Sequence, residues 1–470
     1  TALNLGTSVI VTTINSGTAG SGNGDITVSN AINWSGVGSL TLTANRNIAL
    51  NANIMASGQG AGFTAKANGS ISAGAANLLF QTNNGSLVFW SNANGGSAGG
   101  IAMNQNALTF NTANGSTSQT TGGGNIIFAG GSAVDANGNP TGAAVSSGYG
   151  ISFNPAVAGN NLTRIYSGGG NITMNASSTG SVGLYFWQAT DINAGNGAVN
   201  ISARSASSMG MEFNAGGGAT SGTSITGRGI TLTGTSDTGD YTGLLIQNNF
   251  ANIVSTGSGD VRLTGTSNGS TAGSAAVGLN LRGTVSITSA DGQIVLMGTS
   301  RTSTGVNHYG GSVQSTGVGS ISVTGTSTSW AGIYQPNAMN YTTTSGNITF
   351  NATGSSGMDI AGGNITTTTG HVLFNGVSAG SGAAVAWSSA ANVTTAGGSI
   401  AVNGTASSGR GISSSSNLTL TVSQGAGGIT ISGTSNGSSK QGIFLNGTAV
   451  NLSTASGDIT ITGTSGTAAI

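Results

Sequence analysis

The sequence has no cysteine, only three prolines and very few charged residues. The lack of cysteine excludes disulfide bonds, thiolate metal ligands and a cysteine nucleophile. Ten basic residues balance ten acidic ones, and charged residues make up 4% of the 470-residue chain. Because the basic residues form no cluster, the chain lacks the positive patch that binds nucleic acid or an anionic membrane. No apolar run reaches the roughly 18 residues of a membrane-spanning helix. The first residues also lack the basic and apolar regions of a signal peptide.

Glycine and small polar residues dominate what is present. The chain has 85 glycines, yet 36% of its residues are hydrophobic and regularly spaced. This spacing predicts a thin, repeated core rather than disorder. The segment Ile-Thr-Leu-Thr-Gly-Thr-Ser at residues 230–236 defines a repeat whose copies start 24–33 residues apart. Eleven copies begin at Ile172, Val199, Ile230, Val261, Ile294, Ile321, Ile348, Val372, Ile400, Ile429 and Ile459.

Each repeat contains about three short segments in which apolar and polar residues alternate, separated by turns of Gly, Ser, Asn and Asp. This pattern predicts three short strands per repeat, which form one coil of a parallel β-helix, or β-solenoid. Within the repeat, Ile230 and Leu232 are expected to point inward, while Thr231 and Thr233 point outward. The scarcity of proline fits ladders that use nearly every backbone N–H.

The repeat predicts one continuous solenoid over residues 1–470. Residues 1–170 are expected to form shorter, looser coils, and residues 171–470 regular coils of about 29 residues. A polar stretch at residues 130–150, with Asp135 and Pro140, is expected to leave the helix as a loop. Strands in the first third are expected to start at Leu40, Phe63, Leu87, Leu108, Ile126 and Ile151.

These spacings predict about 17 or 18 coils of roughly 20–33 residues, in a rod on the order of 80 Å long. No polar cap is visible at residues 468–470, so the sequence predicts a fragment of a longer chain, or rods that join end to end.

Residues 24–60 resemble the coils of large two-partner-secretion exoproteins, the filamentous-haemagglutinin-like and high-molecular-weight-adhesin-like family. The resemblance is carried by GDITV, by an Asn-Trp-Ser turn at residues 33–35, and by LTLTA followed by Asn-Arg-Asn. It implies a right-handed parallel β-helix that an outer-membrane transporter exports to the surface of a Gram-negative bacterium. It also implies roles in adhesion, biofilm formation and surface fibres.

Few residues are suited to catalysis. Asp25, Asp260 and Asp458 each follow a glycine and precede a strand, a position typical of a corner residue. Asp237, Asp240 and Asp260 are the best candidates for a polysaccharide-cleaving carboxylate pair. His308 and His371 lie about two coils apart without a third ligand, so neither a metal site nor another cofactor is predicted.

Exposed aromatic side chains are the candidate contact surface, because Trp and Tyr favour carbohydrate or protein contacts. Aromatic stacking inside a wide corner of the core is the alternative. The candidates are Trp330, Tyr334, Tyr341, Tyr185 and Trp187.

The leading hypothesis is a non-enzymatic, secreted adhesin or fibre segment that mediates cell-cell or cell-surface attachment. It would bind a cell-surface glycan or protein receptor through many weak contacts along a long polar surface. The alternative is a self-assembling subunit of an extracellular filament or sheath, and a polysaccharide-acting β-helix enzyme is less favoured.

Overall fold

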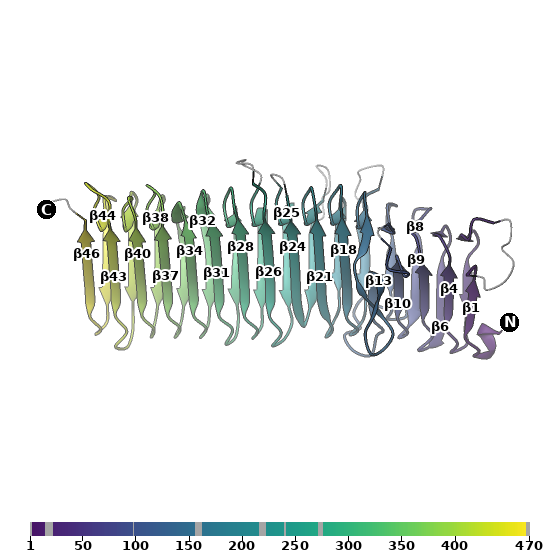
Figure 1. Ribbon diagram of the computed structural model, residues 1–470. Helices are drawn as coiled ribbons and strands as arrows, with labels where there is room; N and C mark the ends of the chain where they lie inside the picture. Colours follow the sequence, from purple (N-terminus) through teal and green to yellow (C-terminus); the bar gives the residue numbers. More distant parts are fainter. Residues whose placement is uncertain are drawn as a thin grey trace. The chain divides into compact units, whose positions relative to one another are not determined.

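A computed structural model describes residues 2–14, 22–96, 98–155, 162–215, 222–238, 241–270 and 276–466. Parallel strands stack as a right-handed β-solenoid of about 15 turns, with one short 3-10 helix, η1 (Leu3–Leu5), in these residues (Figure 1). The predicted fold class is therefore confirmed. The chain divides into two compact units, residues 1–237 with 247–249 and residues 238–246 with 250–470, and each is described by itself.

Unit 1 has three strands in each coil, which we assign to sides A, B and C. Side A contains β1 (Val9–Thr12), β4 (Leu40–Ala44), β7 (Phe63–Ala67), β10 (Leu87–Ser91), β13 (Ile126–Val134), β18 (Ile172–Ser178), β21 (Ala198–Ser205) and β24 (Gly229–Ser236). Side B contains β2 (Ile26–Val28), β5 (Ile48–Leu50), β8 (Ile71–Ala73), β11 (Ile101–Ala102), β16 (Ile151–Phe153), β19 (Leu184–Phe186) and β22 (Met211–Asn214). Side C contains β3 (Ile32–Trp34), β6 (Ile54–Gln59), β9 (Leu79–Asn83), β12 (Thr109–Asn111), β17 (Leu162–Tyr166), β20 (Ala189–Asn193) and β23 (Thr223–Gly227).

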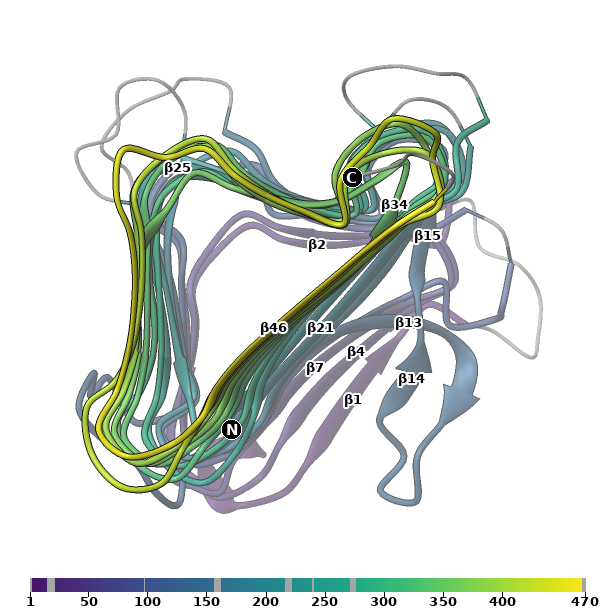
Figure 2. The same ribbon diagram turned by 90° about the vertical axis from the view of Figure 1, so that its left-hand side faces the viewer.

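Unit 2 repeats the three-sided coil, and side A is its long straight side (Figure 2). Side A contains β26 (Val261–Ser267), β28 (Ile294–Ser300), β31 (Ile321–Ser327), β34 (Ile348–Gly354), β37 (Val372–Ser378), β40 (Ile400–Ala406), β43 (Ile429–Ser435) and β46 (Ile459–Ser465). Side B contains β29 (Val306–His308), β32 (Ala331–Gln335), β35 (Ser356–Ile360), β38 (Val385–Trp387), β41 (Ile412–Ser414) and β44 (Ile443–Leu445). Side C contains β30 (Gly311–Ser315), β33 (Met339–Thr343), β36 (Gly363–Thr367), β39 (Ala391–Thr395), β42 (Leu418–Val422) and β45 (Val450–Thr454). The longer strands β25 (Leu244–Ser255) and β27 (Leu279–Ser289) complete the described strands; β27 pairs with β29 through its first part and with β30 through its second.

The core consists of rows of apolar residues that stack from coil to coil. On side A of unit 1, Val199 pairs in register with Ile230 and Ile201 with Leu232, and these inward side chains are buried. The residues between them face outward, as the alternation predicts. Phenylalanines extend some rows. The rings of Phe350 and Phe374 in unit 2 stack 5.0 Å apart, an arrangement that adds stability beyond simple burial.

The Gly-Thr-Ser ending of the repeat turns the chain from side A to side B. In unit 2, a Cβ atom at Gly404 would overlap the carbonyl oxygen of Gly411, so the chain can fold back this closely only on glycine. In the next copy the serine that ends the repeat is buried, and Ser435 Oγ donates a hydrogen bond to the Gly409 carbonyl at 2.7 Å. These contacts explain why the sequence keeps this ending through so many copies.

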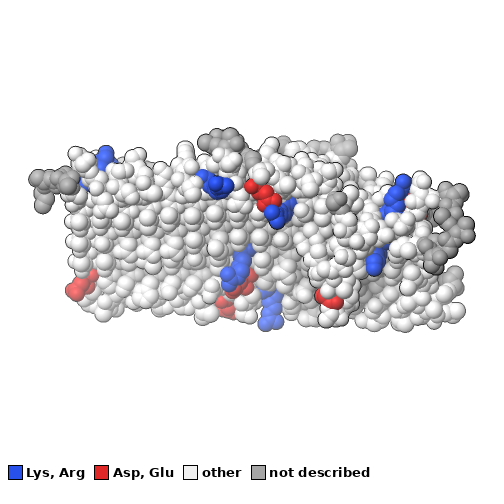
Figure 3. All heavy atoms as spheres, in the orientation of Figure 1, with Lys and Arg blue, Asp and Glu red and all other residues white. Residues whose placement is uncertain are grey.

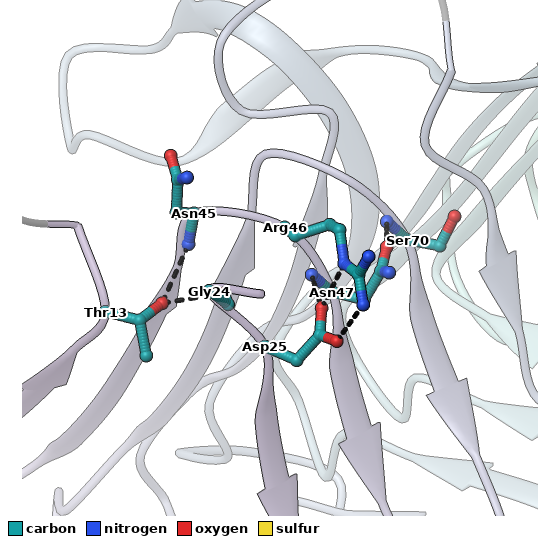
Figure 4. A network of polar contacts seen from close by, with 7 residues as sticks. All are labelled: Thr13, Gly24, Asp25, Asn45, Arg46, Asn47 and Ser70. Atoms are coloured by element: carbon teal, nitrogen blue, oxygen red, sulfur yellow. Dashed lines mark hydrogen bonds and ion pairs between the residues drawn. The ribbon is translucent and has the colours of Figure 1, made fainter. Parts of the chain in front are cut away.

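Polar side chains just before a strand link the corners of successive coils. In unit 1, Asp25 Oδ1 accepts a hydrogen bond from the Asn47 N–H at 3.0 Å, and Asn47 Oδ1 accepts one from the Ser70 N–H at 2.9 Å (Figure 4). Arg46 also pairs with Asp25 and lowers the pKa of that carboxyl to about 2, chiefly through its side-chain hydrogen bond. Asp25 is therefore a corner residue, as predicted, and its carboxylate binds Arg46 and the Asn47 N–H of the next coil.

The coil count is lower than the 17 or 18 expected from the sequence. Leu87 pairs directly with Ile126, and Ile126 with Ile172, so each of these pairs marks a single coil. The sequence predicts separate coils at Leu108 and Ile151, but these segments supply sides C and B of those longer coils. Long and short coils contain the same alternating strand segments, so the sequence pattern alone does not show how long each coil is.

The polar stretch at residues 130–150 contains an antiparallel hairpin. Strand β13 continues past its parallel pairing and turns back as β14 (Pro140–Gly142), which projects from the coil (Figure 2). At its tip, the Asp135 carboxylate accepts hydrogen bonds from the N–H groups of Asn137 and Asn139. The chain then rejoins side A through β15 (Ala144–Ser146), which pairs with β18. The ladder therefore resumes in register after the hairpin.

Candidate functional site

Two of the three carboxylates suggested for catalysis have a structural partner. In unit 1, Arg204 Nε donates to Asp237 Oδ2 at 2.6 Å. In unit 2, Asp260 accepts from Arg262 at 2.6 Å and from the Gln293 N–H at 2.9 Å, so it links two coils. Asp240 lies outside the described residues. The geometry thus gives the two described carboxylates roles as ion-pair and corner residues.

Each histidine has a separate structural setting. His371 Nδ1 accepts a hydrogen bond from the Ser399 N–H at 3.0 Å, so it is one rung of a corner ladder in unit 2. His308 is buried in the core, and its Nδ1 lies 3.2 Å from the Tyr341 hydroxyl oxygen. Among the described residues, no group of three or more His, Asp or Glu side chains is placed to hold a metal ion.

Two of the predicted contact residues are not exposed, which corrects the sequence prediction. Tyr341 is 1% exposed, because the alternation of β33 turns it inward with Met339. Its ring packs edge-on against Phe350, and its hydroxyl donates to Gln335 Oε1 at 3.3 Å. Tyr341 is therefore a core residue with a satisfied polar end.

Tyr185, the second of these, points outward from side B of unit 1 but is covered. It is 8% exposed, stacked on Tyr149 with ring centroids 5.1 Å apart and packed against Trp187 at 5.7 Å. Trp187 is half-buried at the edge of this cluster. Tyr185 and Trp187 therefore pack with Tyr149 outside the core rather than filling a wide corner inside it.

Trp330 and Tyr334 remain on the surface and line a hollow in unit 2. Trp330 is 58% exposed and Tyr334 is half-buried, and their ring centroids lie 6.4 Å apart with the planes at 89°. The hollow has a volume of about 450 Å³ and lies where side A turns into side B over three successive coils. Its lining consists of Ser329, Trp330, Ala331, Tyr334, Ser355, Ser356, Asp359, Ser381 and Gly382.

The serine turn at the end of side A holds Trp330 in place. Ser327 Oγ accepts a hydrogen bond from the Trp330 N–H at 2.9 Å and donates to the Ser303 carbonyl of the preceding coil. The Trp330 carbonyl accepts from the Ser355 N–H of the following coil at 2.8 Å. The tryptophan backbone is thus held by its own turn and by the following coil, and Ser327 connects that turn to the preceding coil, while the ring stays largely exposed.

Asp359 also lines the hollow, although the sequence pattern did not single it out. It pairs in register with Tyr334 on the neighbouring strand, so the two side chains lie next to each other on the outward face of side B. The signal was present in the sequence, since Tyr334 and Asp359 occupy the same step of the alternation in consecutive repeats. Partial burial raises the pKa of the Asp359 carboxyl, and a hydrogen bond from Ser388 opposes this shift.

The hollow combines two aromatic rings, one carboxylate and several serines. Aromatic faces pack against the C–H faces of sugars and attract cations, while hydroxyls and a carboxylate accept or donate hydrogen bonds to polar ligands. On the face of the molecule shown in Figure 3, basic and acidic side chains are sparse among uncharged ones. The arrangement is suited to recognising a small polar group rather than a highly charged polymer.

The comparisons with known proteins leave the family undetermined, since no protein-family model matches the chain and no curated protein matches it significantly. In the described residues, no helix has the length and apolar character needed to cross a lipid bilayer.

Proposed function

We propose that the chain is a segment of an extracellular surface adhesin and that the hollow at Trp330 contacts a cell-surface glycan. The observation that carries the proposal is the pair of rings, Trp330 and Tyr334, placed at a surface hollow with Asp359 and several serines. Exposed tryptophan is rare in this chain, and here its backbone is fixed by hydrogen bonds with Ser327 of its own turn and Ser355 of the following coil. A rigid aromatic surface beside hydroxyl groups is a common way to bind sugars.

Attachment through this hollow would be weak for a single molecule. A ligand bound to two rings and a few polar groups buries little area, so affinity would come from many copies on one cell surface. The resemblance of residues 24–60 to two-partner-secretion exoproteins supports the same proposal. On the basis of this resemblance, the proposal includes export of the chain by an outer-membrane transporter of a Gram-negative bacterium.

The test is a glycan-binding survey with the full chain and a Trp330→Ala, Tyr334→Ala double variant. The double variant is expected to lose at least about tenfold in binding to the glycans that the unchanged chain retains. Both rings lie at the surface, so the fold should persist and the circular dichroism spectrum should be unchanged.

Tyr241 provides the matched control, because it is an exposed tyrosine of unit 2 outside the hollow. Tyr241→Ala should bind like the unchanged chain. Equal binding by the double variant and the unchanged chain would show that the hollow is not the contact site.

A further inference from the structure

Asp359 combines the lack of an ion pair with a partly buried carboxylate. Three aspartates in the described residues form ion pairs with an arginine: Asp25 with Arg46, Asp237 with Arg204 and Asp260 with Arg262. Asp359 has no such pair. Within the described part of the chain, it is also the one acidic residue with a buried carboxylate oxygen, Oδ1, that lacks a hydrogen-bond partner.

An unpaired carboxylate in a partly desolvated position is unfavourable. Burial is the larger influence on Asp359 and raises its pKa, and the only opposing influence is the hydrogen bond from Ser388. Burying a charge without a partner costs several times more than burying a paired one. A cation bound in the hollow would remove this cost, whereas a neutral ligand would exclude water and leave the charge unpaired.

The aromatic rings favour the same kind of ligand. Elsewhere the chain places its own cations over outward rings. Lys66 Nζ lies 3.9 Å from the ring centroid of Trp90, and the guanidinium carbon of Arg410 lies 3.9 Å from that of Phe444. In the portion that the structure describes, no cation lies over Trp330 or Tyr334. The exposed aromatic faces beside a carboxylate form a surface that attracts a cation.

We propose that the hollow binds a protonated amine carried by an amino sugar, with the ammonium between the Asp359 carboxylate and the rings of Trp330 and Tyr334. This inference rests on the proposed glycan-binding function and names its ligand class. The surrounding serine hydroxyls of Ser355, Ser356 and Ser381 are available to the sugar hydroxyls. The amine distinguishes this ligand from the acetylated sugar, which has the same ring but no charge.

The experiment compares two probes that differ only in the amine. A β-1,4-linked glucosamine tetrasaccharide and its fully N-acetylated form are titrated into the full chain at about pH 6, where such amines are protonated. The free-amine form is expected to bind at least about tenfold more tightly than the acetylated form. Asp359→Asn should abolish most of this preference.

Two further variants control for fold and for charge. Asp359→Ala introduces the residue that the next coil has at the same register position, Ala386, so the coil is expected to fold normally. It should lose the preference as Asp359→Asn does. Asp291→Asn removes an exposed carboxylate from the turn between β27 and β28, away from the hollow, and should keep the preference.

Each outcome separates the two proposals. If both tetrasaccharides bind equally and binding requires Trp330, the amine inference is wrong and the glycan-binding proposal stands. The same holds if the survey finds Trp330-dependent binding only to neutral or acidic glycans. If no glycan binding depends on Trp330, both proposals fail.

Discussion

Single residues in this solenoid show how a polar group can be accommodated in a narrow core. Leu281 and His308 occupy the same register position in adjacent coils, yet one is apolar and the other titratable. His308 is tolerated because Tyr341 provides a hydroxyl beside its Nδ1. Burial lowers the pKa of His308 to about 3.

The first prediction concerns pH. The unfolded chain protonates His308 below about pH 6.5, whereas the folded chain does so only near its lowered pKa of about 3. The free energy of unfolding therefore keeps its full value with respect to His308 above about pH 6.5. It falls progressively as the pH decreases from about 6.5 toward 3, because the unfolded chain binds a proton that the folded chain does not. His308→Leu should show a smaller loss of stability between pH 7 and pH 4, measured by urea denaturation at each pH.

The control for this measurement is His371→Asn, which keeps a side-chain acceptor at the corner and leaves His308 in place. It should retain the pH dependence of the unchanged chain. If His308→Leu and the unchanged chain lost stability in parallel, His308 would not be the group responsible.

The sequence could place these residues only in part. Alternation in Met339-Asn340-Tyr341 alone indicates that Tyr341 points inward. Its closeness in sequence to Trp330 and Tyr334 favours the opposite interpretation, an exposed aromatic residue. What the sequence could not show was its polar partners, His308 and Gln335, since these come from other strands. Asp359 required the register of two coils to be known, because its neighbour Tyr334 is 25 residues away in the chain.

At the scale of the coil, the repeat itself carried most of the information. The inward rows, the three strands per coil and the corner positions follow from alternation and turn residues. The coil count did not follow, because β12 and β16 have the same apolar pattern as side A strands. Only backbone pairing distinguishes a new coil from a new side of the same coil.

The second prediction concerns the turn from side A to side B. Gly404→Ala would force a Cβ onto the Gly411 carbonyl, so we expect a loss of about 1–3 kcal/mol in stability from overpacking. Alanine stands at the same repeat position at Ala176, Ala203 and Ala352, so the restriction belongs to the coils in which the following turn approaches as closely as at Gly404. Hydrogen exchange of peptides covering residues 400–414 would measure the effect locally.

Gly397→Ala is the matched control, because a Cβ there meets nothing closer than the Thr368 carbonyl oxygen at 4.0 Å. It should be neutral or slightly stabilising, since alanine restricts the unfolded chain more than glycine does. Similar destabilisation by both substitutions would mean that backbone freedom, rather than the close approach, explains the glycine of the repeat.

For the whole molecule, the low charge content has a direct consequence for stability. Apolar rows and backbone ladders carry the fold, and the described ion pairs are three in number and partly exposed. Exposed ion pairs contribute little, and salt weakens that contribution further.

The third prediction is that raising NaCl from about 0.05 M to about 0.5 M changes the free energy of unfolding by less than about 1 kcal/mol. Urea denaturation at both salt concentrations would measure this. Binding of the free-amine tetrasaccharide to the same sample serves as the contrast, because a charge-dependent contact should weaken over this range. A large salt effect on unfolding would contradict the view that apolar rows dominate.

The hairpin formed by β13 and β14 has a consequence for how such a chain can change. It is inserted within side A, and pairing with β18 resumes directly afterwards through β15. The hairpin residues therefore form one continuous stretch of sequence, distinct from the residues before and after it that pair with β18. New loops can be acquired or exchanged at such points without redesigning the interior. A peptide epitope grafted in place of residues 135–139 would use the protein as a display scaffold.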